Sequence, residues 1–113
     1  MTTSNIGIKI LSNCKIHFKD NENFYHREDG PAVEYDDGSK LYYKNDKLHR
    51  EGGPACEWIN GNKFWYKNDK LHREDGPAIE EVSGFNAWYI NGKNMNCSTQ
   101  EHFLKLKKTL GIK

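Results

Sequence analysis

Short apolar and aromatic runs, separated by polar turn signals, follow one another along most of this chain. One such unit consists of Ala55-Cys56-Glu57-Trp58-Ile59, then Asn60-Gly61, then Asn62-Lys63-Phe64-Trp65-Tyr66-Lys67. Two runs of this kind around Asn-Gly predict a β-hairpin with a type I′ turn, because Asn and Gly tolerate the positive φ that this turn requires. Asp37-Gly38 and Ser83-Gly84 occupy the same place in the flanking units.

The hairpin unit recurs with a fixed period. The segment His-Arg-Glu-Asp-Gly-Pro-Ala fills His26–Ala32 and His72–Ala78, and the near copy His-Arg-Glu-Gly-Gly-Pro-Ala fills His49–Ala55. Both steps, 49 − 26 and 72 − 49, equal 23 residues. A period of this size indicates a repeat architecture. The sequence therefore predicts an all-β repeat fold, an elongated antiparallel sheet of stacked β-hairpins.

The turn length predicts which side chains share a sheet face. With a two-residue turn, Val33 faces Tyr42, Cys56 faces Trp65 and Ile79 faces Trp88. Alternation along each strand then places these six side chains on one face and the tyrosines that follow on the other. The second strand of each unit is expected to end at a segment such as Asn68-Asp69-Lys70.

Both ends of the chain depart from the repeat. At the start, Ile6, Ile8 and Ile10 alternate before the turn candidate Ser12-Asn13, which predicts a degenerate first hairpin over about residues 5–23. Full repeats follow at about 24–46, 47–69 and 70–96, within a single domain of residues 1–113. A short capping helix is expected at about 98–110, as a repeat stack requires. Its signals are the capping box Ser98-Thr99-Gln100-Glu101, the apolar stripe Phe103, Leu106 and Leu110, and the C-cap candidate Gly111.

Composition narrows the class of protein. The net charge is +1 and only 35% of the 113 residues are hydrophobic, yet 12% are aromatic, which suits a thin sheet better than a thick core. The first residues lack the pattern of a signal peptide, and no apolar run reaches the roughly 20 residues of a membrane span. Cys14, Cys56 and Cys97 have no metal-type spacing. We therefore expect reduced thiols and an intracellular location.

The recurring pattern of two aromatic residues, Lys, Asn, Asp or Gly and Lys, followed by Leu-His, resembles the MORN repeat. With His-Arg-Glu-Asp-Gly-Pro-Ala beside it, the chain more closely resembles the divergent MORN-like repeats of large DNA viruses of amoebae, over about Phe24 to Asn96. It departs from the usual MORN pattern, which carries His-Gly-x-Gly and a glycine-rich Tyr-x-Gly-x-Trp stretch. The resemblance implies an elongated antiparallel sheet used for protein contacts, often as a homodimer. For a viral protein it implies the host cell cytoplasm or the virion.

The recurring histidines invite a metal-site interpretation, but the repeat geometry opposes it. Positions two strands apart lie about 9–10 Å from each other, whereas two histidine nitrogens on one zinc lie within about 4 Å. A structural role for His26, His49 and His72 is therefore favoured. The sequence contains no Ser-His-Asp order, P-loop or CxxC pair, and its acids lie at repeated positions. We expect neither an enzyme nor a cofactor.

A single sheet layer with one short helix leaves an apolar face uncovered, and such faces mark interfaces. The sequence is therefore interpreted as a structural, protein–protein interaction module that forms a homodimer or binds an unidentified protein. The expected interface residues are Val33, Tyr42, Cys56, Trp58, Trp65, Ile79 and Trp88. The alternative is a binder of nucleic acid or anionic membrane surfaces. Its basic edge would consist of Arg27, Arg50, Arg73, Lys44 and Lys67, although the arginines are equally interpreted as turn ion pairs with the neighbouring glutamates.

Overall fold

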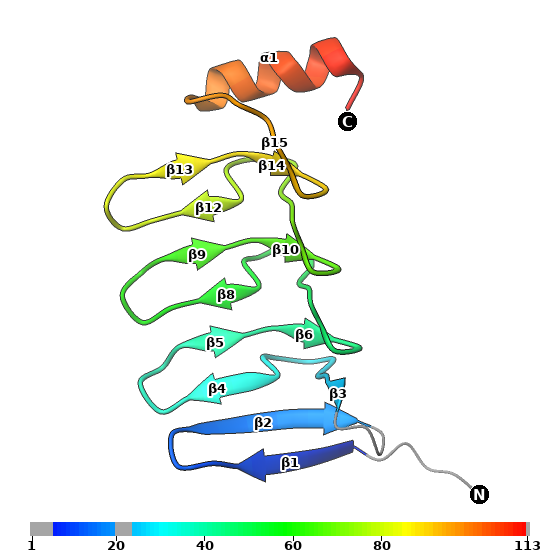
Figure 1. The fold of residues 1–113 in the computed structure, drawn as a ribbon, viewed down its shortest axis with the longest axis vertical. Coiled ribbons are helices and arrows are strands. Elements are labelled where there is room, and N and C mark those ends of the chain that lie inside the picture. The colour runs from blue at the N-terminus through cyan, green and yellow to red at the C-terminus, as the bar shows by residue number, and fades with distance from the viewer. Residues whose placement is uncertain (1–5, 20–23, 113) are drawn as a thin grey trace, which may run out of the picture.

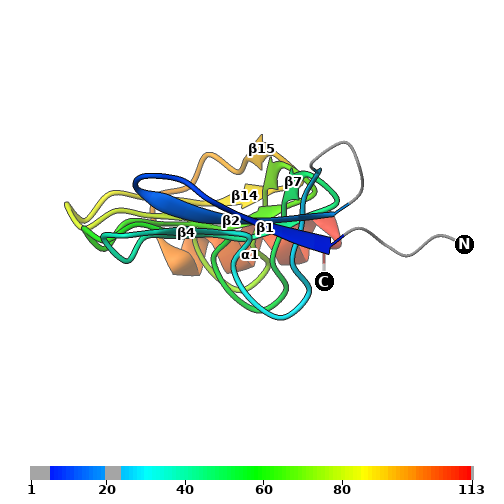
Figure 2. The ribbon, with the colours of Figure 1, turned by 90° about the horizontal axis from the view of Figure 1, so that it is seen from below.

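The stack of hairpins expected from the repeat is the architecture of the protein. The computed structural model describes residues 6–19 and 24–112. The hairpins lie one above another along the longest axis of a flat molecule of 51 × 34 × 18 Å (Figure 1). Viewed along the stack, the sheet is a thin layer, with helix α1 (Gln100–Leu110) and the connector loops on one side (Figure 2). The all-β repeat with a C-terminal capping helix is confirmed.

The main sheet comprises nine antiparallel strands among the described residues. Their order is β1-β2-β4-β5-β8-β9-β12-β13, and β3 pairs with β2 beside this path. The strands are β1 (Ile6–Ile10), β2 (Cys14–Lys19), β3 (Phe24–Tyr25), β4 (Val33–Tyr35), β5 (Lys40–Leu41), β8 (Cys56–Glu57), β9 (Lys63–Phe64), β12 (Ile79–Glu80) and β13 (Asn86–Ala87). The degenerate first hairpin is β1–β2, and residues 5 and 20–23 of its expected span lie outside the described residues.

The turns that close the main-sheet hairpins are not of the expected type. In the middle repeat, Gly61 N–H donates to the Trp58 carbonyl (2.9 Å), and Trp58 N–H donates to the Asn62 carbonyl (3.0 Å). Gly61 has a φ of 102°, whereas Asn60 has no positive φ. This is a three-residue loop, a type I turn followed by a left-handed glycine bulge. The prediction of two-residue type I′ turns at Asn60-Gly61 and its equivalents is wrong.

The extra loop residue shifts the register by one position. Val33 lies opposite Leu41, Cys56 opposite Phe64, and Ile79 opposite Ala87. The predicted partners Tyr42, Trp65 and Trp88 each come one residue later, and a shift of one residue moves a side chain to the other face. The prediction that all six side chains share a face is therefore wrong.

Each repeat also contains a second, smaller hairpin that the sequence interpretation missed. These hairpins are β6–β7 (Tyr43–Lys44 with Lys47–Leu48), β10–β11 (Tyr66–Lys67 with Lys70–Leu71) and β14–β15 (Tyr89–Ile90 with Lys93–Asn94). Both turn residues have positive φ in each case, for example 51° and 69° at Asn45 and Asp46. Positive φ at both central residues defines the type I′ turn. The segment expected to end a strand is therefore itself a hairpin turn.

Helix α1 closes the C-terminal end of the stack. Its N-cap is Thr99, whose hydroxyl accepts from His102 N–H at 3.1 Å, so the helix begins one residue later than a Ser98 cap would place it. The expected C-cap Gly111 is confirmed, with a φ of 75°. Phe103 is fully buried against Trp88 and Met95. Leu110 was expected in this apolar stripe but is 62% exposed.

Candidate functional site

The observed register sorts the side chains of the main sheet into two contrasting rows. Directly opposed residues of an antiparallel sheet project to the same side. One row, called the apolar ladder here, consists of Ile16, Val33, Leu41, Cys56, Phe64, Ile79 and Ala87. The other, the charge ladder, consists of Lys15, Glu34, Lys40, Glu57, Lys63 and Glu80. Every neighbouring pair in the charge ladder has opposite sign, which favours the observed register over its alternatives.

The apolar ladder forms one face of the sheet. Four of the seven residues are buried within the chain itself, namely Ile16, Val33, Cys56 and Ala87, whereas Leu41, Phe64 and Ile79 remain half-exposed. Tyr35 packs beside this row, and its ring centroid lies 6.1 Å from that of Trp58. Helix α1 lies on the opposite side of the layer (Figure 2). Tyr25 and Tyr43 pack against the buried part of this row, and within the described residues no helix lies over the half-exposed remainder.

On the charged face, the second and third connector loops each lay an arginine over an aromatic ring. The Arg50 guanidinium carbon lies 3.9 Å from the ring centroid of Tyr42, and that of Arg73 lies 3.8 Å from Trp65. Arg73 Nη1 also donates to the carbonyl of Pro77 at 3.2 Å. Its side chain is only 18% exposed. These arginines are therefore part of the packing of the repeat.

The same arginines are paired with carboxylates. The Nη1 atoms of Arg27 and Arg50 lie 3.0 and 3.1 Å from the carboxylates of Glu34 and Glu57, and Arg73 Nη1 lies 3.3 Å from Glu80. In the outer loops the Nε atoms additionally donate to Asp29 and Asp75, at 3.0 and 2.8 Å. Gly52 replaces this aspartate in the middle loop.

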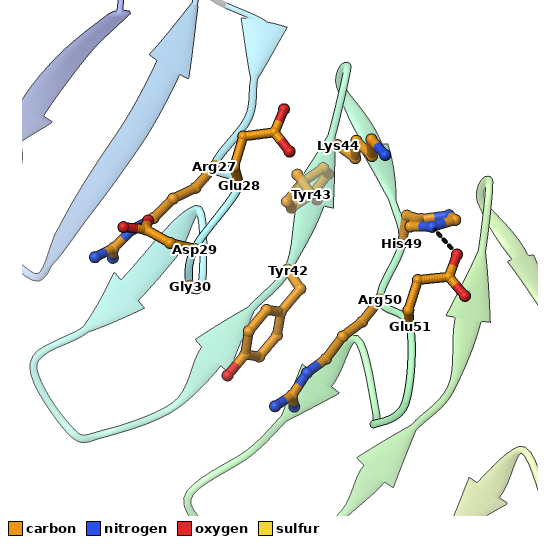
Figure 3. A pocket seen from close by; sticks show the side chains of 10 residues that line it. All are labelled: Arg27, Glu28, Asp29, Gly30, Tyr42, Tyr43, Lys44, His49, Arg50 and Glu51. Carbon is orange, nitrogen blue, oxygen red and sulfur yellow. Dashed lines mark hydrogen bonds and ion pairs between the residues drawn. The ribbon is translucent and has the colours of Figure 1, made fainter.

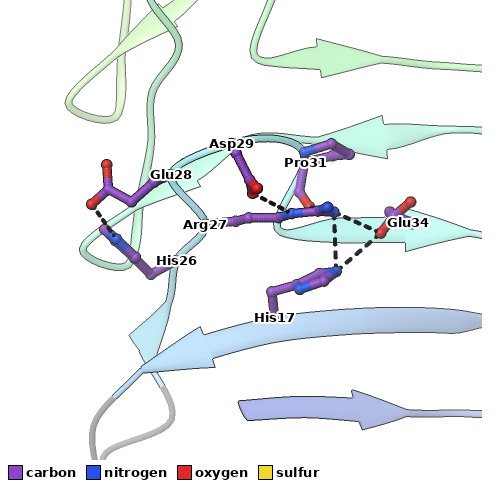
Figure 4. Close-up of polar contacts among 7 residues, drawn as sticks. All are labelled: His17, His26, Arg27, Glu28, Asp29, Pro31 and Glu34. Carbon is purple, nitrogen blue, oxygen red and sulfur yellow. Dashed lines mark hydrogen bonds and ion pairs between the residues drawn. The ribbon is translucent and has the colours of Figure 1, made fainter. Parts of the chain in front are cut away.

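At the first connector, a histidine takes the place of the aromatic ring. His17 N–H donates to the Ala32 carbonyl, as Tyr42 N–H does to that of Ala55 one repeat later. Its Nε2 lies 3.0 Å from the Glu34 carboxylate and 3.1 Å from Arg27 Nη1 (Figure 4). Because a guanidinium only donates and a carboxylate only accepts, a neutral ring can satisfy one of these two neighbours.

At the last repeat, helix α1 replaces the missing arginine loop. Trp88 Nε1 donates to the Gln100 side-chain oxygen at 2.8 Å, and its ring centroid lies 6.3 Å from that of Phe103. Gln100 Nε2 donates in turn to the Asp75 carbonyl, and Lys107 Nζ donates to the Glu74 carbonyl. The helix thus covers the tryptophan that a further Arg-Glu-Asp loop would otherwise cover.

The connector histidines link consecutive repeats. The Nδ1 atoms of His26, His49 and His72 accept from the backbone N–H groups of Asn45, Asn68 and Asn91, at 2.9, 3.1 and 2.9 Å. Their Nε2 atoms lie 2.7 to 3.0 Å from the carboxylates of Glu28, Glu51 and Glu74. Because Nδ1 accepts, Nε2 carries the proton and donates to the carboxylate. Among the described residues, no group of three or more potential ligands is placed to hold a metal ion.

Shallow grooves separate neighbouring connector loops. The first has a volume of about 370 Å³ and is lined by residues that include Arg27, Glu28, Tyr42, Arg50 and Glu51 (Figure 3). The second, about 410 Å³, has equivalent residues one repeat later. Figure 3 shows the Arg50 side chain lying along Tyr42 and the His49 ring turned toward Glu51. Acidic and basic side chains are mixed in both grooves, so neither presents a single charge to a ligand.

The charged contacts shift the acidities of the carboxylates. A hydrogen bond from Arg27 holds the pKa of Asp29 below its usual value, and a hydrogen bond from Arg73 does the same for the pKa of Asp75. The pKa of Glu34 is lowered chiefly by its hydrogen bond with His17. All three carboxylates are therefore held in the ionised form at neutral pH.

Burial shifts the acidities on the apolar side of the sheet. It raises the pKa of the Cys56 thiol to about 12, and it also raises the pKa values of Tyr43 and Tyr66. The three cysteines lie in separate surroundings: Cys14 in the N-terminal cluster, Cys56 in mid-sheet, and Cys97 beside the helix cluster. None is bonded to another.

Lysines gather on the small hairpins, which the sequence interpretation did not predict. Lys44 lies directly opposite Lys47, and Lys67 opposite Lys70, across the type I′ turns. With Lys93 they form the lysine ridge, and all five side chains are exposed. The ion pairs found among the described residues involve arginine and histidine and include none of these lysines. The turn chemistry of Asn45-Asp46 was the signal that could have identified these opposed pairs.

The structure thus separates the residues that the sequence placed in one interface. The apolar side of the sheet holds Val33, Cys56, Ile79 and Trp58. The charged side holds the other three, Tyr42, Trp65 and Trp88, which lie beneath Arg50, Arg73 and helix α1 respectively. The basic edge divides as well. Arg27, Arg50 and Arg73 are paired with carboxylates, and Lys44 and Lys67 stay exposed. Leu41 and Phe64 are surface residues that the sequence interpretation did not include.

Comparison with known proteins identifies no protein similar to this chain. The chain matches no family model, no curated protein and no solved structure. Across the described residues, no helix has the length and apolarity needed to cross a lipid bilayer.

Proposed function

We propose that this chain is a structural protein–protein interaction module that forms a homodimer through its apolar sheet face. The observation that carries the proposal is the apolar ladder, a row of seven apolar residues across seven strands. Sheets normally pack against a second layer. The opposite face already has its arginine loops and helix α1, so a second copy of the apolar face is the self-complementary cover that two-fold symmetry supplies.

The proposed role is non-catalytic, because the charged groups of the connector loops are already engaged with one another. The connector loops hold their charged groups in pairs: each arginine contacts a carboxylate, and each histidine uses both ring nitrogens. Groups committed in this way serve packing and linkage between repeats. The resemblance of the repeat to MORN-like repeats of large DNA viruses is part of the same proposal, because it implies protein contacts by an elongated sheet.

The experiment compares two matched phenylalanine substitutions by light scattering. Phe64 lies in the middle of the apolar ladder, whereas Phe85 is 54% exposed in the β12–β13 hairpin loop. Phe64→Glu is expected to halve the mass of the particle, because it places a charge inside the contact, and Phe85→Glu is expected to leave the mass unchanged. Circular dichroism confirms that both variants are folded. An unchanged mass in folded Phe64→Glu would refute the apolar face as the interface.

A specific observation favours one second candidate, the binding of a nucleic-acid backbone by the lysine ridge. Like charges directly opposite each other destabilise a hairpin, yet Lys44 opposes Lys47 and Lys67 opposes Lys70. None of the ion pairs found in the described part of the chain involves these lysines. Phosphate groups supplied by a partner would remove this repulsion. The arginines do not contribute, because their guanidinium groups are already paired with carboxylates.

A salt titration tests this second candidate with generic duplex DNA as the probe and anionic vesicles as the comparison. The affinity of a phosphate-binding surface falls linearly on a log–log plot against salt, with a slope of about −0.9 per phosphate contact. The double variant Lys44→Ala/Lys67→Ala should flatten this slope by nearly two such contacts. The control Lys105→Ala/Lys108→Ala removes two exposed lysines from α1. Equal losses in both double variants would mean that only net charge matters.

A further inference from the structure

The two ends of the stack are built differently. At the C-terminal end, the last strand of the main sheet, β13, has two residues, and helix α1 lies beyond it (Figure 1). At the other end, β1 has five residues, all paired with β2 in an unbroken register. Among the described residues, β2 is the only strand that pairs with β1. The outer edge of β1 is thus the longest regular strand edge that the sheet presents.

The backbone directions along β1 follow from the hydrogen bonds of β2. His17 N–H donates to the Ala32 carbonyl, and the His17 carbonyl accepts from His26 N–H, so both groups point away from β1. Ile8 lies opposite His17. In an antiparallel ladder, residues whose groups point inward alternate with residues whose groups point outward. The N–H and carbonyl of Ile8 therefore point to the free edge, as do those of Ile6 and Ile10.

We propose that β1 pairs antiparallel with β1 of a second copy of this chain, around a two-fold axis at Ile8. This register sets Ile8 opposite Ile8 of the second copy, and Ile6 opposite Ile10 of the second copy. All of these residues have outward-pointing backbone groups, so each opposed pair can form two hydrogen bonds. The two nine-stranded sheets then join end to end into one continuous sheet.

The side chains of β1 are self-complementary in the same register. Ile8 and Ile10 are 58% and 67% exposed, and the pairing covers each with another isoleucine. Lys9 falls opposite Gly7 of the second copy, so no lysine faces a lysine. The Phe18 ring lies over Gly7, so close that an added Cβ would be 2.5 Å from it. The lysine of the second copy therefore arrives beside an aromatic ring, as Lys9 already does within its own chain at 5.9 Å.

Strand β1 lacks the features by which proteins usually prevent an exposed strand edge from pairing, so pairing with a second copy accounts for it better. Proteins protect exposed edges with prolines, bulges, several charges or very short strands. Strand β1 has five residues in regular register, no proline, and one lysine. That lysine already contacts the ring of Phe18 on the sheet face, away from the hydrogen-bonding edge. The edge thus remains competent to pair.

The β1 pairing does not involve the apolar face. It is therefore tested in the Phe64→Glu variant, in which association through the apolar face is expected to be lost. The expected particle has a mass of about twice 13.2 kDa and a maximum dimension near twice 51 Å, about 102 Å, by light scattering and small-angle X-ray scattering. A face-to-face dimer would keep a length near 51 Å. The length therefore separates the failure of one contact from the failure of the other.

Two substitutions of Ile8, which lies on the proposed two-fold axis, test the β1 pairing. Ile8→Lys places two like charges directly opposite each other and is expected to halve the mass and the length. The control Ile59→Lys changes an isoleucine that is 65% exposed in a hairpin loop and should leave both unchanged. Ile8→Pro removes an outward N–H while leaving the bonds between β1 and β2 in place, and it should act like Ile8→Lys. A monomeric, 51 Å particle in the Phe64→Glu background, or a 102 Å dimer that survives both Ile8 variants, would overturn the proposal.

Discussion

The arginine that covers Trp65 offers the sharpest test of how the repeats are held together. Arg73 stacks on the ring at 3.8 Å, donates to the Pro77 carbonyl at 3.2 Å, and pairs with Asp75 and Glu80. Arg73→Met keeps most of the aliphatic stem and removes the charge and all the donors. The substitution therefore isolates the contribution of the guanidinium from that of apolar packing.

The expected loss follows from the contacts. The stacking contributes about 1 kcal/mol, the partly buried charged hydrogen bond to the carbonyl about 1.5 kcal/mol, and the exposed ion pairs together about 0.5 kcal/mol. The total is about 3 kcal/mol. One kcal/mol lowers the melting temperature of a domain of this size by about 4 °C, so a fall of roughly 12 °C is expected.

Thermal unfolding followed by circular dichroism and tryptophan fluorescence measures this effect. Lys70→Met is the control, because it removes an exposed cation from the same repeat and should change stability by less than about 0.5 kcal/mol. Arg50→Met should fall between the two, since Gly52 provides no carboxylate to the middle arginine. If Arg73→Met melts within 2 °C of the control, the arginines are surface charges and the reasoning fails.

Three further outcomes are expected. Gly61→Val should melt at a lower temperature than Gly111→Val: both glycines have a positive φ, 102° and 75°, but a Cβ at Gly61 would also meet Val82 at 3.0 Å, whereas nothing lies within 4 Å of a Cβ at Gly111. Equal melting temperatures would contradict the close contact at Gly61. Burial raises the pKa of Cys56 to about 12 and also raises that of the less buried Cys97, so in the folded protein at pH 8 the Cys56 thiol should react with a thiol reagent more slowly than that of Cys97, and at the same rate in denaturant. The pKa of Asp75 is lowered by its paired arginine, so the stability that Asp75 contributes is present above the ordinary aspartate pKa and is lost as the pH falls through its pKa in the folded protein. Asp75→Asn should therefore lose less stability between pH 6 and pH 2 than the parent protein. Identical curves of stability against pH for the two proteins would exclude the pairing.

The repeat, the hairpins and the capping helix could be predicted because each has a local signal. A period of 23 residues, Asn-Gly between aromatic runs, and a capping box before an apolar stripe need no knowledge of distant contacts. The turn type could not be predicted in this way. A glycine with positive φ suits both the two-residue type I′ turn and the three-residue loop with a glycine bulge. Gly61 therefore fitted the wrong turn as well as the right one.

The register could have been predicted from the charges. The expected pairing sets Glu57 opposite Phe64 and Trp58 opposite Lys63, so it mixes charged and apolar residues across the hairpin. The observed pairing sets Cys56 opposite Phe64 and Glu57 opposite Lys63. Opposite charges and apolar pairs are each favourable across strands. Counting both sets of pairs from the sequence would have selected the three-residue loop.

The aromatic pairs beneath the arginines could not be derived from the pattern alone. Tyr42, Trp65 and Trp88 are apolar residues that lie on the charged face of the sheet. They are tolerated there because the next connector returns over the sheet and lays an arginine on Tyr42 and on Trp65. Trp88 is covered instead by Phe103 and Gln100 of helix α1. Such cover comes from residues several positions away, and strand periodicity carries no information about it.

Each repeat is stabilised by contacts with the repeat that follows it, so the repeats at the two ends of the stack differ from those between them. The histidine of one connector accepts from the turn of the next repeat. The Leu48 carbonyl accepts from Asp69 N–H, and Leu48 N–H donates to the Asp69 carboxylate. Stability in such a stack is a sum over neighbouring repeats, so a terminal repeat lacks one set of contacts. Helix α1 compensates at one end by covering Trp88. At the other end, β1 still has an unpaired edge within the described chain. A second copy pairing at β1 would supply the missing neighbour, which is the physical reason to expect assembly at that end.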